Sequence, residues 1–84
     1  MERAKFVFRK QTYNAYDAQQ IVFEACKYKS EINISNGNKR ANAKSIIGLV
    51  SMNFVPGEEY VVAAEGADAK SAAAGVSKFI SELG

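Results

Sequence analysis

Ser45 is the side chain of this sequence best placed to do chemistry, because it stands directly before a short apolar run. A serine in that place can cap a helix by accepting a bond from a backbone N–H. The start of a helix is also a favourable place for a phosphate group. The pattern therefore leaves two interpretations open for Ser45, a plain helix cap, which the local pattern favours, and a site that would accept a phosphate group.

Histidine is absent from the chain, and Cys26 is its one cysteine. The absence of histidine removes the commonest metal ligand, the usual general base and any phosphohistidine intermediate. A single cysteine excludes an internal disulfide and supplies no zinc site. We therefore expect no metal, no cofactor and no enzymatic activity, and we expect Cys26 to pack as a small apolar side chain rather than act as a reactive thiol.

The run after Ser45 is apolar on more sides than a short helix can bury. Leu49 and Met52 are three residues apart and can face the core together. Ile46, Ile47 and Val50 fall on other parts of the circumference. Periodicity alone favours the core for such residues, but the domain is small. We expect at least two of the three to be exposed and to bind a protein partner.

The chain of 84 residues forms a single domain, 1–84, with no room for a second core. Its formal net charge of +2 is too small for a nucleic-acid footprint, and the basic residues are spread over several elements. No apolar run approaches the length of a membrane span, and the first residues do not resemble a signal peptide. We expect a cytoplasmic protein that binds neither membrane nor nucleic acid.

Periodicity predicts seven elements in the order strand, helix, strand, strand, helix, strand, helix. The strands are expected at 4–9, 31–35, 39–43 and 59–65, and the helices at 15–28, after Ser45, and after an N-cap at Asp68. Asn36-Gly37 indicates a type I′ hairpin, and Pro56-Gly57 ends any helical run before the fourth strand. One antiparallel sheet with helices on one face is the economical α+β arrangement.

The segment 42–52 resembles the regulatory-serine helix of HPr, the small phosphocarrier of the bacterial sugar phosphotransferase system. The likeness is ungapped and extends at lower strength over essentially the whole chain. It implies an open-faced β-sandwich of four strands and three helices (βαββαβα). In HPr proteins a Gly-X-His-Ala-Arg-Pro-Ala motif precedes the first helix, and its histidine takes a phosphoryl group from enzyme I. Asn14 stands at that histidine position, Tyr16 at the arginine position and Asp17 at the proline position.

These three substitutions all oppose phosphoryl transfer. The amide of Asn14 is not nucleophilic, and we expect Asn14 to act as the N-cap of the first helix. Tyr16 removes the guanidinium group that would neutralise a phosphate. Asp17 adds a negative charge in the first turn. The chain is therefore expected not to be a histidine phosphocarrier. Two alternatives stay open, a carrier with a substitute acceptor such as Asp17 and a degenerate HPr copy.

The resemblance also implies a role for Ser45. In Gram-positive HPr proteins the serine at this place is phosphorylated by an ATP-dependent kinase, and the product binds a transcriptional regulator. Lys44 is the expected partner of such a phosphate, with Lys39 and Arg40 as further candidates.

The apolar residues Ile46, Ile47 and Val50 match the family's docking patch for enzyme I, the serine kinase and regulators. An HPr fold with the serine but no histidine is similar to the catabolite-repression paralogue Crh. The sequence is thus expected to encode a regulatory or binding protein that works through Ser45 and the adjacent helix surface, as a monomer or a weak dimer.

Overall fold

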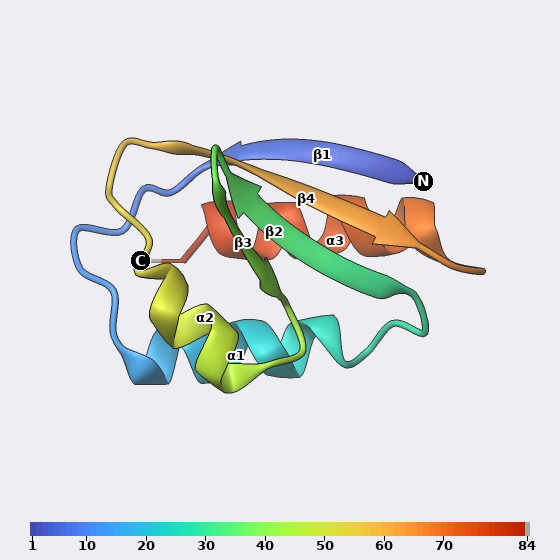
Figure 1. Cartoon of the computed structure of the whole chain (residues 1–84), viewed down its shortest axis with the longest axis horizontal. Coiled ribbons are helices and arrows are strands. Elements are labelled where there is room, and N and C mark those ends of the chain that lie inside the picture. The colour runs from blue at the N-terminus through green and yellow to red at the C-terminus, as the bar shows by residue number, and fades with distance from the viewer. Residues whose placement is uncertain (84) are drawn as a thin grey trace.

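The computed structural model describes residues 1–83 and contains one four-stranded antiparallel sheet with three helices on one face (Figure 1). The strands lie in the order β1-β4-β2-β3. The elements are β1 (Glu2–Val7), α1 (Ala15–Ala25), β2 (Glu31–Asn36), β3 (Lys39–Asn42), α2 (Ile46–Met52), β4 (Glu59–Glu65) and α3 (Ala69–Ser81). The βαββαβα order and the open-faced α+β sandwich predicted from the sequence are confirmed.

Strand β4 lies between β1 and β2 and pairs with both of them. Because side chains alternate across a strand, Tyr60, Val62 and Ala64 all face the helices, and all three are buried. Ile32 and Ile34 of β2 are buried on the same face, as their alternation predicted. The hydrophobic core therefore lies between this face of the sheet and the three helices.

A cluster of aromatic rings closes the core where the chain enters α1 and leaves α2. Phe54 is its centre, with ring centroids 5.3 Å from Phe8, 4.9 Å from Tyr13 and 4.7 Å from Tyr60. The 4.9 and 4.7 Å contacts are edge-to-face, an arrangement that adds stability beyond the area buried. The cluster fixes the loop before α1 against the segment that follows α2.

Helix α1 ends at Ala25, three residues before the predicted end. The amides of Lys27 and Tyr28 donate to the carbonyls of Glu24 and Ala25, which tightens the chain into short-range turns. Cys26 is the C-cap residue and is exposed, so the expectation that it packs as a small apolar side chain was wrong. Cys26 directly follows Ala25, the last residue of the buried stripe of α1, so its side chain turns toward solvent.

The hairpin between β2 and β3 is shifted by one residue from the prediction. Asn36 pairs with Lys39, so the two loop residues are Gly37 and Asn38. Gly37 has a φ of 57° at the first loop position, and Asn38 is not among the residues with positive φ. Glycine at that position is typical of a type II′ turn, so the predicted type I′ turn was wrong.

Helix α2 ends where Asn53 adopts the left-handed conformation, with a φ of 50°. Asparagine tolerates this region better than most residues and so serves as a helix stop. The turn at Pro56-Gly57 follows, as predicted, and leads the chain into β4.

Asp68 occupies the N-cap position of α3 but makes no cap bond with its side chain. Its carboxylate instead accepts hydrogen bonds from the backbone amides of Lys29 and Ser30, at 2.9 and 3.0 Å, and from the Ser30 hydroxyl. The start of α3 lies against the α1–β2 connection, where these donors need a partner. The prediction that Asp68 caps its own helix was therefore wrong in its hydrogen bonding.

Candidate functional site

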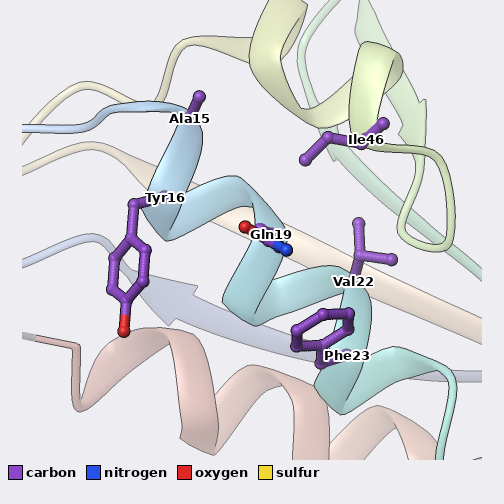
Figure 2. Close-up of a pocket in the computed structure, with 6 residues that line it drawn as sticks. All are labelled: Ala15, Tyr16, Gln19, Val22, Phe23 and Ile46. Atoms are coloured by element: carbon purple, nitrogen blue, oxygen red, sulfur yellow. The ribbon is translucent and has the colours of Figure 1, made fainter.

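Helices α1 and α2 lie against each other and form a groove of about 520 Å³ (Figure 2). Figure 2 shows Ile46 at the start of α2 facing the side of α1 that carries Val22. The lining residues are Ala15, Tyr16, Gln19, Val22, Phe23 and Ile46. The fold thus brings the start of α1 and the start of α2 to one side of the molecule. The loop before α1 is where the sequence analysis expects the phosphoryl acceptor of an HPr protein.

The start of α1 is closed by a capping box between Asn14 and Asp17. The Asp17 amide donates to Asn14 Oδ1 at 3.1 Å, and the Asn14 amide donates to Asp17 Oδ2 at 3.2 Å. Two donors that a helix start would otherwise offer to a ligand are satisfied in this way. The prediction that Asn14 is the N-cap is confirmed.

Asp17 does not stand as a free negative charge in the first turn. Its side chain is 2% exposed, and its Oδ1 lies 2.6 Å from Lys10 Nζ. The expected repulsion of an anion by Asp17 is therefore reduced, because Lys10 balances the charge. The structure supplies another obstacle to phosphate binding, because the Lys10 ammonium group and the Asn14 backbone amide are both already bound to the Asp17 carboxylate.

Tyr16 replaces a cation with a neutral phenol and is 67% exposed on the first turn of α1. Figure 2 shows its ring projecting from this turn. A phenol offers one hydroxyl donor and no positive charge, whereas a guanidinium group binds phosphate through two parallel charged bonds. The first turn of α1 therefore presents an amide at Asn14 and a phenol at Tyr16, neither of which carries a charge.

Tyr13 fastens the loop before α1 to the second helix. Its hydroxyl donates to the carbonyl of Leu49 at 2.6 Å. Burial and, to a smaller extent, the nearby charge of Asp17 raise the pKa of Tyr13 above its ordinary value. The hydroxyl is protonated at neutral pH and donates to Leu49, so the relative position of α1 and α2 is held by a polar contact as well as by apolar packing.

Ser45 is the N-cap of α2, as predicted, and its side-chain oxygen accepts a hydrogen bond of 3.1 Å from the Gly48 amide. Its backbone carbonyl accepts from the Leu49 amide at 3.0 Å. The Ser45 side chain is partly exposed. The cap is therefore formed, and Ser45 stays partly exposed at the start of the helix.

The three basic residues predicted to accompany Ser45 are not gathered around it. Lys44 Nζ donates to the carbonyl of Tyr28 at 2.8 Å, so its ammonium group is held by the α1–β2 connection. Lys39 and Arg40 line a separate hollow of about 340 Å³ beside the middle and end of α2. The Lys44 ammonium group would therefore have to leave the Tyr28 carbonyl in order to pair with a phosphate on Ser45.

The apolar side chains of α2 divide as the sequence predicted. Leu49 and Met52 are buried, whereas Ile46, Ile47 and Val50 are 42, 78 and 45% exposed. The expectation that at least two of the three would be exposed is confirmed.

Helix α1 adds two aromatic side chains to this exposed region, Tyr16 and Phe23, the latter 57% exposed. Phe23 was missed by the sequence analysis, although its place outside the buried stripe of α1 could have revealed it. We define the α1–α2 apolar surface as Tyr16, Phe23, Ile46, Ile47 and Val50. Such a concentration of large exposed apolar side chains is typical of a protein-binding surface.

The chain offers no metal site or membrane span over the part that the structure describes. Among residues 1–83, no group of three His, Cys, Asp or Glu side chains is placed to hold a metal ion. Within that range no helix has the length and apolar character needed to span a membrane.

Sequence comparison identifies relatives of this chain. The protein-family model described as "PTS HPr component phosphorylation site" matches residues 7–82. Two phosphocarrier proteins HPr from Buchnera aphidicola, of the subspecies Baizongia pistaciae and Acyrthosiphon pisum, are 39 and 38% identical over 66 residues. In both cases the alignment covers 79% of this chain and 78% of the relative.

Solved structures agree with these matches. An HPr of Thermoanaerobacter tengcongensis is 31% identical, with a TM-score of 0.85 over 95% of this chain and 91% of that chain. A phosphocarrier protein HPr of Bacillus anthracis is 26% identical, with a TM-score of 0.86 over 94 and 95%. Crh of Bacillus subtilis, solved as a domain-swapped dimer, is 31% identical, with a TM-score of 0.79 over 89 and 86%. The chain belongs to the HPr family of the bacterial phosphotransferase system.

Proposed function

We propose that this protein is a regulatory or binding member of the HPr family that acts through Ser45 and the α1–α2 apolar surface and carries no phosphoryl group on histidine. The observation that carries the proposal is the contrast between the two helix starts. At α1 the acceptor position holds Asn14, closed into a capping box. At α2 a partly exposed Ser45 stands beside a large exposed apolar surface.

The chemistry at α1 supports the negative half of this proposal. Asn14 has no nucleophilic atom, and the chain contains no histidine that could replace it. Asp17 is the nearest carboxylate that could serve as a substitute acceptor, but it is buried and paired with Lys10. An in-line attack requires an exposed oxygen, so the burial of Asp17 argues against an aspartyl-phosphate carrier.

The surface at α2 supports the positive half. Exposed apolar side chains contribute to binding when a partner removes them from water, by about 25 cal/mol for each Å². Phosphorylation of Ser45 would add about −1.5 to −2 charge at the edge of this surface. A modified serine could therefore switch the choice of partner without unfolding the domain. The likeness to Crh supports a regulatory role in catabolite repression, with a kinase, a transcriptional regulator or an enzyme I-like protein as the partner.

Phosphorylation by HPr kinase tests the role of Ser45. The purified protein is incubated with the kinase and ATP, and the modified residue is mapped by mass spectrometry. We expect one phosphate per chain on Ser45 and none on the Ser45→Ala variant. Ser51→Ala is the matched control, because Ser51 is an exposed serine of the same helix and should leave the yield unchanged. An unmodified wild-type chain would refute the regulatory form of the proposal.

A second experiment tests for a surviving carrier activity. The protein is incubated with enzyme I and phosphoenolpyruvate labelled in its phosphate, with an HPr that contains histidine as the positive control. We expect no label on this chain. A stoichiometric label that is lost in alkali would indicate an acyl phosphate and would overturn the proposal.

Charge placed on the α1–α2 apolar surface tests docking separately from modification. Ile47→Asp adds a carboxylate to the most exposed residue of the surface and should lower the rate of phosphorylation by HPr kinase about tenfold or more, as for a central interface residue. Ala74→Asp adds the same charge to an exposed position of α3 and should leave the rate unchanged. Equal effects of the two variants would show that docking does not use this surface.

A further inference from the structure

The face of the sheet that is not covered by helices carries a row of small and polar side chains. Strand pairing places Arg3 opposite Ala63, Ala63 opposite Asn33, and Asn33 opposite Asn42. The neighbouring positions along these strands face the buried core, so this row faces away from the helices. It therefore lies on the opposite side of the sheet from the core and α1–α2 (Figure 1).

A hollow of about 220 Å³ is present on this open face. Its lining residues are Met1, Arg3, Asn33, Ser35, Arg40 and Ala63. Ala63 lies on the strand between β1 and β2, and its small side chain leaves space above the sheet. Arg3 and Arg40 come from the two edge strands, β1 and β3, about 14 Å apart at the usual strand spacing. Long arginine side chains on opposite edges can thus reach over the same hollow.

Arg40 also lines the hollow beside α2, but the polar side chains around the open-face hollow form no ion pair and no side-chain hydrogen bond within residues 1–83. The ion pairs among residues 1–83 are Lys10–Asp17 and Lys27–Glu24, so neither guanidinium group is paired there. The side chains of Asn33 and Ser35 likewise form no hydrogen bond within residues 1–83. The guanidinium groups of Arg3 and Arg40, the side-chain amide of Asn33 and the hydroxyl of Ser35 are therefore all available to a ligand.

Negative charges on the open face stand beside the hollow and at one end of the face, but not in the hollow's lining. Glu31 and Glu65 are paired with each other in the next row of the sheet, and Glu59 pairs with Val7 near the other end. None of these carboxylates lines the hollow. They weaken the positive potential on the side of the hollow that adjoins Glu31 and Glu65, so an anion must be held by its direct bonds to the lining residues.

We propose that this hollow binds a phosphate group, either free inorganic phosphate or a phosphate monoester. Guanidinium groups bind phosphate oxygens through paired, charged hydrogen bonds, which a lysine cannot reproduce. Asn33 and Ser35 add neutral donors between the two arginines. The lining contains no aromatic ring on which a base could stack, so a phosphate group rather than a nucleic-acid base is the recognised chemistry. The site is separate from Ser45 and does not depend on its modification.

A titration followed by NMR tests the site. Inorganic phosphate is added to ¹⁵N-labelled protein at constant ionic strength, with sodium chloride as the matched salt. We expect saturable shifts at the amides and side chains of Arg3, Asn33, Ser35 and Arg40. The double variant Arg3→Gln, Arg40→Gln should weaken binding at least about tenfold, since bonds to charged groups are the strong ones. Lys70→Gln removes one exposed positive charge from α3 and should leave the affinity unchanged.

Circular dichroism establishes that each variant is folded, and Ser45→Ala should retain the wild-type affinity for phosphate. This last variant separates the site from the function proposed for α2. Shifts that follow ionic strength alone, or a double variant that binds as tightly as the wild type, would overturn the proposal.

Two further ligands distinguish the source of the phosphate. A hexose monophosphate that binds more tightly than inorganic phosphate would identify a metabolite as the ligand. A phosphoserine peptide that binds more tightly would identify the phosphate of a partner protein. In both cases the gain should be lost in the double arginine variant, and a gain that persists there would contradict the assignment to this hollow.

Discussion

Lys10 and Asp17 form an ion pair at the N-terminus of α1, with 2.6 Å between Nζ and Oδ1. The Asp17 side chain is buried, whereas the lysine remains partly exposed. The same carboxylate completes the capping box with Asn14. One side chain thus neutralises a cation and satisfies a helix-terminal amide. The polar groups at this helix start thus bind one another and stabilise the start of α1.

Asp17→Ala tests the stabilising role of this carboxylate. The variant leaves the Asn14 amide without its acceptor and Lys10 without its partner. Removing one member of a buried pair is costly, but Lys10 can turn toward water and recover part of the loss. We expect the free energy of unfolding to fall by about 1–3 kcal/mol, measured by urea denaturation at neutral pH.

Glu24→Gln is the control for the loss of an ion pair as such. Glu24 near the end of α1 pairs at 3.0 Å with Lys27, whose side chain is 68% exposed, while the Glu24 side chain is 15% exposed. Surface pairs contribute between about 0 and 1 kcal/mol, so this variant should be nearly neutral. Equal losses in the two variants would contradict the structural role assigned to Asp17.

Tyr13 should make the stability of the protein sensitive to alkali. Its pKa is raised from an ordinary value of 10.0 by burial and by the charge of Asp17. Above pH 10 the unfolded chain loses the Tyr13 proton while the folded chain keeps it. The contribution of this group is therefore fully present below pH 10 and is lost as the pH rises toward the raised folded pKa. Urea denaturation between about pH 9 and pH 11 should show the decline.

Tyr13→Phe removes both the ionisation and the hydrogen bond to Leu49. The Leu49 carbonyl belongs to the last four of α2, which lack partners within the helix. We expect a loss of about 1 kcal/mol at neutral pH and a smaller decline above pH 10 than in the wild type. Tyr16→Phe is the control, because the Tyr16 ring is exposed and its variant should keep the wild-type pH profile.

Local patterns predicted the elements well because they depend on neighbours in the sequence. Ile32 and Ile34 were assigned to the core from their alternation alone, and both are buried. Ser45 was assigned as a cap from its place before an apolar run, and it accepts the Gly48 amide. The exposure of Ile47 followed from the limited surface that a short helix can bury.

The misassigned side chains depend on contacts between distant segments. Asp68 could cap its own helix or bind a loop that is 38 residues away in the sequence, and only the packing of α3 against that loop decides between them. Lys44 likewise binds the carbonyl of Tyr28, 16 residues earlier. The pairing of Asp17 with Lys10 depends on the path of the loop before α1. Local patterns carry no information on these choices.

The two sides of α2 should respond very differently to truncation. Leu49 is fully buried, and Leu49→Ala should lower the free energy of unfolding by about 2–5 kcal/mol because it leaves a cavity. Ile47 is 78% exposed, and Ile47→Ala should change the free energy of unfolding by less than about 0.5 kcal/mol. Urea denaturation measures both. A large loss for Ile47→Ala would show that this side chain packs against the domain and is not available to a partner.

The carboxylate of Asp68 should report on the contact between α3 and the α1–β2 connection. The hydrogen bond from the Ser30 hydroxyl, followed by that from the Lys29 amide, lowers the pKa of Asp68 below its ordinary value of 3.8. The stabilisation is therefore present above pH 3.8 and is lost as the pH falls through the lowered folded pKa.

Ser30→Ala removes the largest of these contributions but leaves the two backbone amides in place. We expect the pKa of Asp68, followed by ¹³C NMR of its carboxyl carbon, to rise in this variant but to stay below 3.8. Ser71→Ala, at an exposed position of the same helix, should leave it unchanged. If the pKa did not move in Ser30→Ala, the hydroxyl would not be the donor that holds the carboxylate, and the contact between these two segments would rest on the backbone amides alone.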